Sequence, residues 1–298
     1  FMGRNISVID LSPLMRNGDF RANAVATLAS VATEKLAANV LKGKQFFYDA
    51  RDTRLARDSY MSCASCHSEA GHDGRTWDFT GFGEGLRNTV SLRGRAGLGH
   101  GLLHWSGNFN EVQDFEGQIR NFAGGTGLMT DAQFNTGTRS QPMGDNKAGV
   151  SADLDALAAY LGSLTQMPAS FGRTSTGALS TAAASGLTVF RNQNCAGCHG
   201  GTSFVASGAV LADVGTLKAS SGKRLNGTLW GLDVPTLRDV AGTAPYLHDG
   251  SAATLAAAIS AHRGVSLGST DLNNLVAYLG QIGSEEATGT ATLPGTST

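Results

Sequence analysis

The four cysteines of this 298-residue chain stand in two copies of one short pattern, CASCH at residues 63–67 and CAGCH at residues 195–199. In Cys-x-x-Cys-His, one tight turn presents two thiols for covalent attachment of a haem, and the adjacent imidazole becomes an iron ligand. A lone match has two other interpretations, a redox-active thiol pair and half of a zinc site. Two matches in the same repeated context predict two covalent c-type haems. The attachment residues are Cys63, Cys66, His67, Cys195, Cys198 and His199.

That context is an internal repeat. Residues 153–164 (DLDALAAYLGSL) and 271–282 (DLNNLVAYLGQI) agree at seven of twelve positions, and each places its leucines and tyrosine on one helical face. Upstream of each cysteine pair, residues 43–47 (GKQFF) and 186–190 (GLTVF) are helical candidates with a glycine and an aromatic residue. The order helix, cysteine pair, long loop and closing helix therefore occurs twice. It predicts a mainly α-helical protein with two cytochrome c-type domains in tandem, each around one covalently bound haem.

Local composition indicates where these units begin and end. Residues 168–181 are rich in Ser, Thr, Gly and Ala, which is typical of a linker. Residues 5–11 alternate as a strand does, and we expect this strand to have no partner, as a remnant of a neighbouring β domain. The expected organisation is an N-terminal extension at 1–30, a first domain at 31–168, a linker at 169–181, a second domain at 182–284 and a mobile tail at 285–298.

Charge and hydropathy exclude several classes of function. Lys and Arg number 23 against 24 Asp and Glu, so no basic surplus is available for nucleic acid. No apolar run approaches the roughly 18 residues of a membrane-spanning helix. No charged-then-apolar leader follows Phe1, and we expect a mature or excised form. Haem attachment of this type occurs outside the cytoplasmic membrane, so the expected location is periplasmic or extracellular.

The second iron needs an axial ligand opposite His199, and the loop before the closing helix contains two histidines and no methionine. Residues 251–262 are typical of a short helix ended by Gly264, which places His262 in its last turn. His248 lies in a turn-like stretch, where histidines more often donate a supporting hydrogen bond than bind a metal. The pattern favours His262.

The first iron leaves three alternatives open. Its sixth position is open or bound by water, or it is filled by His100 or His104 from the glycine-rich loop, or by Met143. Met143 stands ten residues before Asp153, much as His262 stands nine residues before Asp271.

Residues 234–250 (VPTLRDVAGTAPYLHDG) resemble the C-terminal signature of the bacterial di-haem cytochrome c peroxidases. This family includes the methylamine-utilisation di-haem enzyme and, more distantly, the haem-containing rubber oxygenase. Residues 87–89 (RNT) and 105–107 (WSG) resemble further motifs of the family. The resemblance covers roughly residues 35–284.

The resemblance implies roles for several residues. His262 holds the position of a methionine that ligates the electron-transfer haem in the peroxidases, which implies bis-histidine ligation by His199 and His262 and a lower potential. Trp105 matches a tryptophan between the two haems that assists electron transfer. A calcium ion is implied between the haems, because a set of hard oxygen ligands suits calcium. Its matching ligands are Asn88 and the carbonyls of Thr243 and Pro245.

The first haem site departs from the family pattern. The peroxidases carry a glutamate shortly after a glutamine, whereas no acid stands at that place after Gln118. Phe122 falls near the distal face instead, which is similar to the apolar pocket of rubber oxygenase. Since peroxide cleavage needs a group that moves a proton, we expect feeble peroxide turnover. Nearby acids are expected on a solvated helix face: Glu111, Asp114 and Glu116.

These observations predict an exported di-haem c-type cytochrome that transfers electrons between two haems, with peroxidase-like or related oxidation at the first. It would be an oxidoreductase, with Trp105, Gln118 and Phe122 as candidate catalytic residues. One alternative is a pure electron-transfer domain of a larger multihaem assembly, and another is a dioxygen-using haem oxygenase. Expected partners are an electron-donor or electron-acceptor redox protein and a small-molecule oxidant. The chain is also expected to be part of a larger chain or complex.

Overall fold

The computed structural model describes residues 3–205 and 211–286, and it is rich in helix with little sheet. The described helices are α1 (Ser12–Asn17), α2 (Ala38–Tyr48), α3 (Cys63–Cys66), α4 (Phe115–Asn121), α5 (Asp131–Phe134), α6 (Ala152–Gly162), α7 (Thr181–Asn192), α8 (Leu255–Ser260) and α9 (Ser269–Leu279). The described strands form antiparallel pairs: β1 (Asn5–Asp10) with β2 (Asn23–Ala29), β3 (Thr76–Asp78) with β4 (Leu86–Asn88), β5 (Leu211–Ala212) with β8 (Leu232–Asp233), and β6 (Lys223–Arg224) with β7 (Gly227–Thr228).

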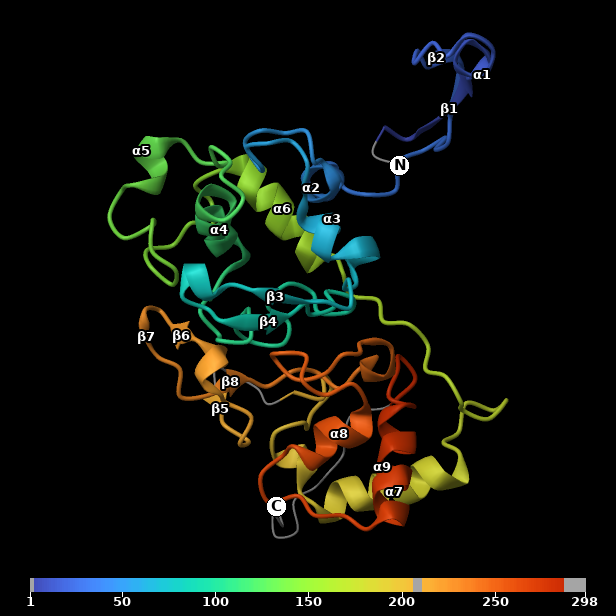
Figure 1. The fold of residues 1–298 in the computed structure, drawn as a ribbon, viewed down its shortest axis with the longest axis vertical. Helices are drawn as coiled ribbons and strands as arrows, with labels where there is room; N and C mark the ends of the chain where they lie inside the picture. Colours follow the sequence, from blue (N-terminus) through green and yellow to red (C-terminus); the bar gives the residue numbers. More distant parts are fainter. Residues whose placement is uncertain (1–2, 206–210, 287–298) are drawn as a thin grey trace.

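Two helical units lie one above the other in Figure 1, each with its own apolar core. In the first unit α2 packs against α6, and in the second α7 packs against α9. These are the helices expected from the glycine–aromatic segments and from the repeated closing segments, so the prediction of a mainly α-helical protein is confirmed. Ser151 and Ser180 cap the N-termini of α6 and α7, because each hydroxyl accepts the backbone N–H of the residue three positions later.

The repeat extends to the side chains where the paired helices cross. Phe47 meets Tyr160 edge to face with ring centres 5.2 Å apart, and Phe190 meets Tyr278 in the same way at 5.4 Å. Each crossing is tight because a glycine stands four residues before the phenylalanine. A Cβ on Gly186 would come within 1.9 Å of the carbonyl oxygen of Asn274, so the crossing requires a residue without a side chain.

Helix α8 is shorter than the sequence predicts. It spans Leu255–Ser260, and His262 lies two residues beyond its end instead of in its last turn. The helix begins later than expected because the Thr254 hydroxyl accepts the N–H of Ala257 and caps the helix there. A bridge between Tyr246 and Ala252 holds the preceding residues in a turn. The backbone N–H of His262 still donates to the carbonyl of Ile259, at 3.1 Å, which holds the residue against the helix.

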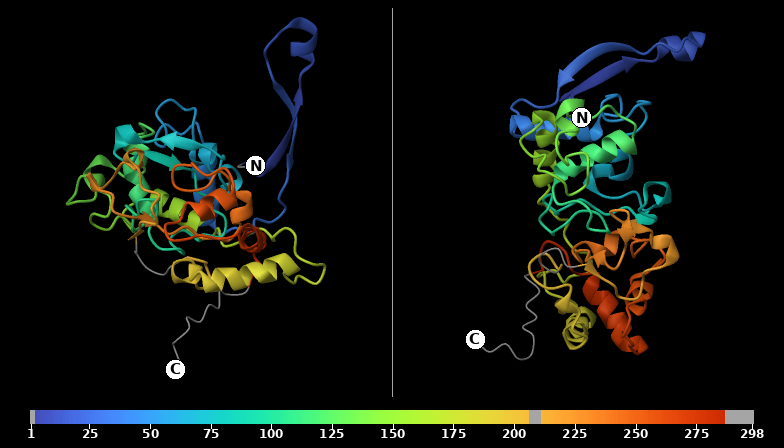
Figure 2. Two further views of the ribbon diagram at one scale, coloured as in Figure 1. Left: turned by 60° about the horizontal axis from the view of Figure 1, so that its bottom comes forward. Right: turned by 90° about the vertical axis from the view of Figure 1, so that its left-hand side faces the viewer.

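The N-terminal strand has a partner, and the expectation of an unpaired strand is wrong. Strand β1 pairs with β2 over their whole length, and helix α1 lies between them in sequence. The hairpin projects away from the helical units (Figures 1 and 2), and its apolar side chains are exposed, as Ile6 is by 59% and Phe20 by 92%. The sequence signal fails because β2 has no alternation of its own.

Residues 163–180 contain no helix or strand, and they connect the two units. The stretch is fastened to the end of the second unit by Arg173, which donates to the carbonyl of Gln281 and pairs with Glu286. Residues 287–298 of the expected mobile tail lie outside the described residues. Within the described ranges, no helix is both long and apolar enough to cross a membrane.

Replacing either crossing glycine should destabilise its unit. Gly43→Ala and Gly186→Ala each push a methyl group into a backbone carbonyl of the partner helix, which we expect to lower the free energy of unfolding by roughly 1–3 kcal/mol. Gly117→Ala in α4 is the control, because its added methyl meets nothing within 4 Å. Urea unfolding measures the difference, and equal midpoints for Gly186→Ala and Gly117→Ala would contradict the packing argument.

Candidate functional site

Each cysteine pair lies on one tight turn that ends in its histidine. Cys63 begins α3 and Cys195 begins a single 3-10 turn, and the N–H of the following histidine donates to the carbonyl of the first cysteine at 2.9 and 2.8 Å. Burial raises the pKa of the Cys63 and Cys195 thiols to about 11, so both are neutral at physiological pH. A redox-active pair needs a depressed thiol pKa, so these values argue against that interpretation.

Each turn opens into its own cavity, of about 270 Å³ in the first unit and about 330 Å³ in the second. The first is lined by the cysteine pair with His67 and by apolar side chains of α2, α4 and α6. The second is lined by the other pair with His199 and by apolar side chains of α7, α8 and α9. An apolar cavity with two thiols and an imidazole on one wall has the donor set and the polarity that a covalently bound haem requires.

In the second cavity His199 and His262 face each other with ring centres 6.5 Å apart. Two metal–nitrogen bonds of about 2 Å each, with the ring centres about 1 Å further back, place axial imidazoles on one ion about 6 Å apart. The observed separation fits that span. Each Nδ1 is occupied by a carbonyl oxygen, that of Pro235 for His199 and that of Ala258 for His262, which leaves each Nε2 free. Burial, followed by the neighbouring His262, lowers the pKa of His199 to about 4 and keeps it neutral.

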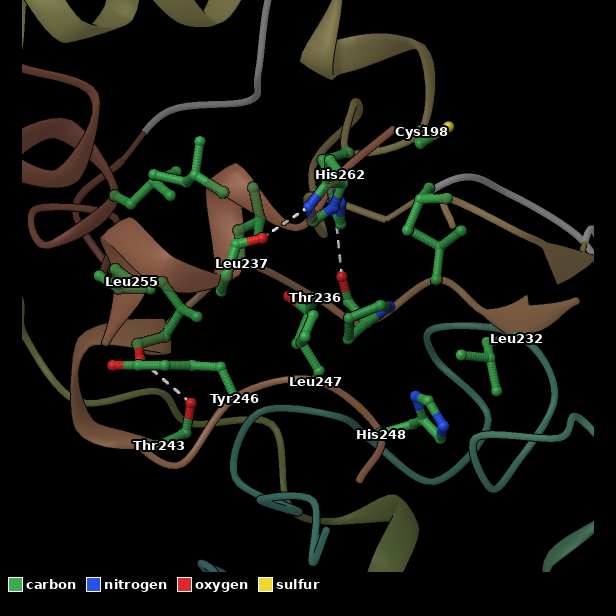
Figure 3. Close-up of a pocket in the computed structure, with 18 of the residues that line it drawn as sticks. Cys198, Leu232, Thr236, Leu237, Thr243, Tyr246, Leu247, His248, Leu255 and His262 are labelled. Carbon is green, nitrogen blue, oxygen red and sulfur yellow. Dashed lines mark hydrogen bonds between the residues drawn. The ribbon is translucent and has the colours of Figure 1, made fainter. Parts of the chain in front are cut away.

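His248 lies at the opposite end of the same cavity from His262 and Cys198 (Figure 3). Its side chain is buried, and its Nε2 lies 2.7 Å from the Ser221 hydroxyl. Its ring also packs edge to face against the ring of Trp105, with ring centres 6.5 Å apart. Its Nε2 is engaged and its Nδ1 has no hydrogen-bond partner in the described structure, so His248 lacks the backbone-carbonyl contact that orients His199 and His262.

Trp105 lines both cavities, and so it stands in the wall between them. Its indole N–H donates to the backbone carbonyl of Asn88 at 2.8 Å, and its own carbonyl accepts the N–H of Asp233 at 2.8 Å. The turn that carries it is closed by a bridge between Leu103 and Phe109. The indole is therefore fixed at the boundary of the two units.

Asn88 and Pro245 also meet at this boundary. The side-chain amide of Asn88 contacts the carbonyl of Pro245 and lies 3.3 Å from that of Leu247, while its Oδ1 is buried without a hydrogen-bond partner. Thr243 lines the same cavity, with its hydroxyl bound to the Val240 carbonyl. Amide and carbonyl oxygens are ligands that calcium prefers, but here the amide of Asn88 presents its nitrogen, and not its oxygen, to the carbonyls of Pro245 and Leu247.

Gln118 and Phe122 both line the first cavity. Phe122 packs against Phe79 with ring centres 5.2 Å apart. His104 also lines this cavity, whereas His100 and Met143 line neither one. The sulfur of Met143 lies 3.5 Å from the Arg224 guanidinium instead.

The acids near Gln118 are not on a solvated helix face, and that expectation is wrong. Glu116 is fully buried, where it accepts the backbone N–H of Leu128 and Met129 and pairs with Arg120. Asp114 is buried as well and pairs with Lys147 at 2.6 Å. Glu111 accepts the backbone N–H of Lys147. These carboxylates hold the long loop onto the first unit, because they satisfy backbone donors that would otherwise be buried without partners.

Three polar residues of the cavities were missed by sequence reasoning. Glu84 lines the first cavity, and Arg95 and Asp233 line both. Burial raises the pKa of Asp233 to about 7, although the charge of Arg95 acts in the opposite direction. Glu84 stands three residues before the RNT motif, which was the one available signal. Asp233 immediately precedes the signature of residues 234–250, but an isolated acid there has no pattern of its own.

Comparisons with known proteins agree with this geometry, although no protein-family model matches the chain. Cytochrome c peroxidase Ccp of Escherichia coli (strain K12) is 28% identical over 289 residues, which cover 83% of this chain and 59% of the relative. Methylamine utilization protein MauG of Methylophilus methylotrophus is 28% identical over 233 residues, covering 70% of this chain and 67% of the relative. The chain thus spans about three fifths of the length of the first relative.

Solved structures share the fold. Hydrazine synthase of Kuenenia stuttgartiensis aligns with a TM-score of 0.56 at 24% identity, covering 84% of this chain and 88% of that one. A MauG-like protein associated with microbial copper homeostasis aligns with a TM-score of 0.55 at 22% identity, covering 85% and 90%. Together with the two Cys-x-x-Cys-His turns in two like units, these relatives support placing the chain in the bacterial di-haem cytochrome c peroxidase superfamily.

Proposed function

We propose that this protein is an exported di-haem c-type cytochrome that moves electrons between its two haems and performs redox chemistry at the first. The observation that carries the proposal is the position of Trp105 in the wall shared by two cavities, each of which has its own Cys-x-x-Cys-His turn. A haem bound in each cavity would supply one-electron redox chemistry. Its attachment would use Cys63 and Cys66 in one unit and Cys195 and Cys198 in the other.

The second cavity is suited to electron relay. His199 and His262 would occupy both axial positions, which leaves no place for a substrate on that side. Both imidazoles are held in one tautomer by backbone carbonyls, so the ligand set changes little between oxidation states. Bis-histidine ligation holds a lower potential than histidine–methionine ligation does.

The boundary is suited to coupling the two cavities. Trp105 presents a fixed aromatic ring to both, and its indole N–H is held by Asn88. A calcium ion bound by Asn88, Thr243 and Pro245 would tie the two units together at the same place. Such an ion would act on the geometry of the boundary, since its oxygen ligands come from both units.

The first cavity is the candidate site of oxidation. Phe122 and Gln118 line it, beside the apolar side chains of α2, α4 and α6. A pure electron-transfer domain is the second candidate, because His104 lines this cavity and offers an imidazole for its sixth position. A redox protein is the proposed electron partner, and peroxidase-type oxidants are the proposed substrates.

The chain expressed with haem maturation tests the function. We expect a pyridine haemochrome spectrum of c-type haem with two haems per chain, since both turns open into cavities that fit one. Electron paramagnetic resonance of the oxidised protein should then show one low-spin and one high-spin ferric haem. Two low-spin signals would instead establish the electron-transfer domain, and a chain without haem would refute the proposal.

His262→Ala should convert the low-spin haem to a high-spin or water-ligated one, because it removes the imidazole that faces His199. His262→Met should restore the low-spin signal and raise the midpoint potential in a redox titration. His248→Ala is the matched control, since that ring is engaged with Ser221. A spin change in His248→Ala with none in His262→Ala would reverse the assignment.

Trp105→Phe should slow electron transfer between the haems while both remain attached, because the smaller ring loses the contact with Asn88 and part of the shared wall. Flash photolysis of the half-reduced, carbon monoxide-bound protein measures the rate, with calcium present. Trp230→Phe is the control, since Trp230 is 60% exposed and lines neither cavity. Equal rates in wild type and Trp105→Phe would assign Trp105 a purely structural role.

A further inference from the structure

The first cavity lacks a carboxylate at the position the family uses, yet it contains another group able to carry a proton. We propose that His104 is the acid–base residue of the first haem site, and that Asn108 and Glu84 position it. The inference rests on the proposed function, because it requires a haem attached at Cys63 and Cys66. The peroxide substrate belongs to the proposed function, and the inference concerns the residues that move its proton.

His104 is held at the cavity by its neighbours. Its φ is +66°, in the left-handed region, which histidine adopts more often than most residues other than glycine do. The imidazole packs against Phe109 with ring centres 4.3 Å apart and edge-on against Phe115 at 5.1 Å. It lines the same cavity as His67, the imidazole that follows the cysteine pair.

The hydrogen bonds around His104 settle which of its nitrogens carries the proton. The Glu84 carboxylate can only accept, so Asn108 must turn its NH2 group toward Glu84 and its Oδ1 toward His104. Oδ1 can likewise only accept, and it lies 2.8 Å from Nδ1 of His104, which must therefore donate. The neutral imidazole thus has its hydrogen on Nδ1 and a free lone pair on Nε2. That is the form that accepts a proton from a bound substrate.

Glu84 is itself held by its neighbours. It therefore orients the amide of Asn108, which in turn orients the ring of His104. The Ser106 hydroxyl donates to its carboxylate at 2.9 Å, and the Arg87 guanidinium pairs with it at 3.1 Å. When Nε2 takes up a proton, the imidazolium is stabilised through Asn108 by this carboxylate.

This link to a carboxylate separates His104 from the other histidines of the cavities. In His67, His199 and His262, Nδ1 bonds a neutral backbone carbonyl, which orients a ring that binds a metal. Among these four, only His104 is connected to a partly buried carboxylate, that of Glu84, through a side chain. His100 lines neither cavity, and its Nδ1 has no hydrogen-bond partner in the described structure.

The proton transfers balance with the electrons that the two haems relay. Nε2 of His104 would take the proton from one peroxide oxygen and return it to the other as the O–O bond breaks, so that the latter leaves as water. Two electrons supplied by the reduced redox partner and two protons from solvent would convert the remaining oxygen to a second water. In total, one H2O2, two electrons and two protons give two H2O.

The test uses the full di-haem chain with His104→Leu, and His100→Leu as the matched control at a neighbouring buried histidine. Steady-state peroxide reduction and the association rate of cyanide with the ferric first haem are measured, since bound HCN must also give up its proton. We expect both rates to fall by a factor of about 10²–10⁴ in His104→Leu. In His100→Leu both rates should equal those of wild type. Carbon monoxide binding to the ferrous haem needs no proton transfer and should be unchanged in both variants.

Asn108→Leu tests the positioning role, because it removes the acceptor of Nδ1 and leaves the imidazole in place. It should slow cyanide association while the rate of carbon monoxide binding stays unchanged, a difference that a collapsed cavity would not produce.

If cyanide and peroxide rates in His104→Leu equal those of wild type, the inference is overturned. A wild-type low-spin first haem that becomes high-spin in His104→Leu also overturns it, since His104 would then be an iron ligand. A chain without haem at Cys63 and Cys66 refutes the proposed function itself, which the haemochrome spectrum reveals separately.

Discussion

A short seam of backbone hydrogen bonds joins the two helical units, and both cavities depend on it. The N–H of Asn88 donates to the carbonyl of His248, and the carbonyl of Asn88 accepts the indole N–H of Trp105. The carbonyl of Trp105 in turn accepts the N–H of Asp233. The first and the last of these bonds run between the two units, so neither unit can shift without breaking them, and a buried hydrogen bond is costly to leave unmade. The relative position of the two cavities follows from this seam.

Local features of the sequence were enough to predict the paired helices α2, α6, α7 and α9 and the two Cys-x-x-Cys-His turns. The glycine–aromatic segments and the repeated DL–AYLG segments specify a helix pair with one tight crossing, because the glycine and the tyrosine must meet there. Cys-x-x-Cys-His specifies its own turn. The position of His262 opposite His199 also followed from its place near a short helix. In each case the physical cause lies within about a dozen residues of the chain.

Long-range contacts were not predictable in the same way. The acids Asp114 and Glu116 follow the spacing of an exposed helix face, yet the loop that buries them comes from residues 126–150. Strand β2 was missed because β1 alone alternates, and a hairpin needs both strands. Glu84 carries no motif, and its place in the first cavity arises only when Ser106 and Asn108 fold back onto it. Such residues gain their surroundings from segments far away in sequence.

The wall shared by the two cavities has a consequence for how the chain tolerates change. Seven residues line both cavities: Asn88, Thr89, Val90, Arg95, Trp105, Asp233 and Pro235. A substitution at any of them alters two environments at once, whereas one on an outer wall, such as Phe122 or Ile259, alters one. The outer walls can therefore be altered one cavity at a time. The shared partition cannot, which makes it the least promising place to retune one half alone.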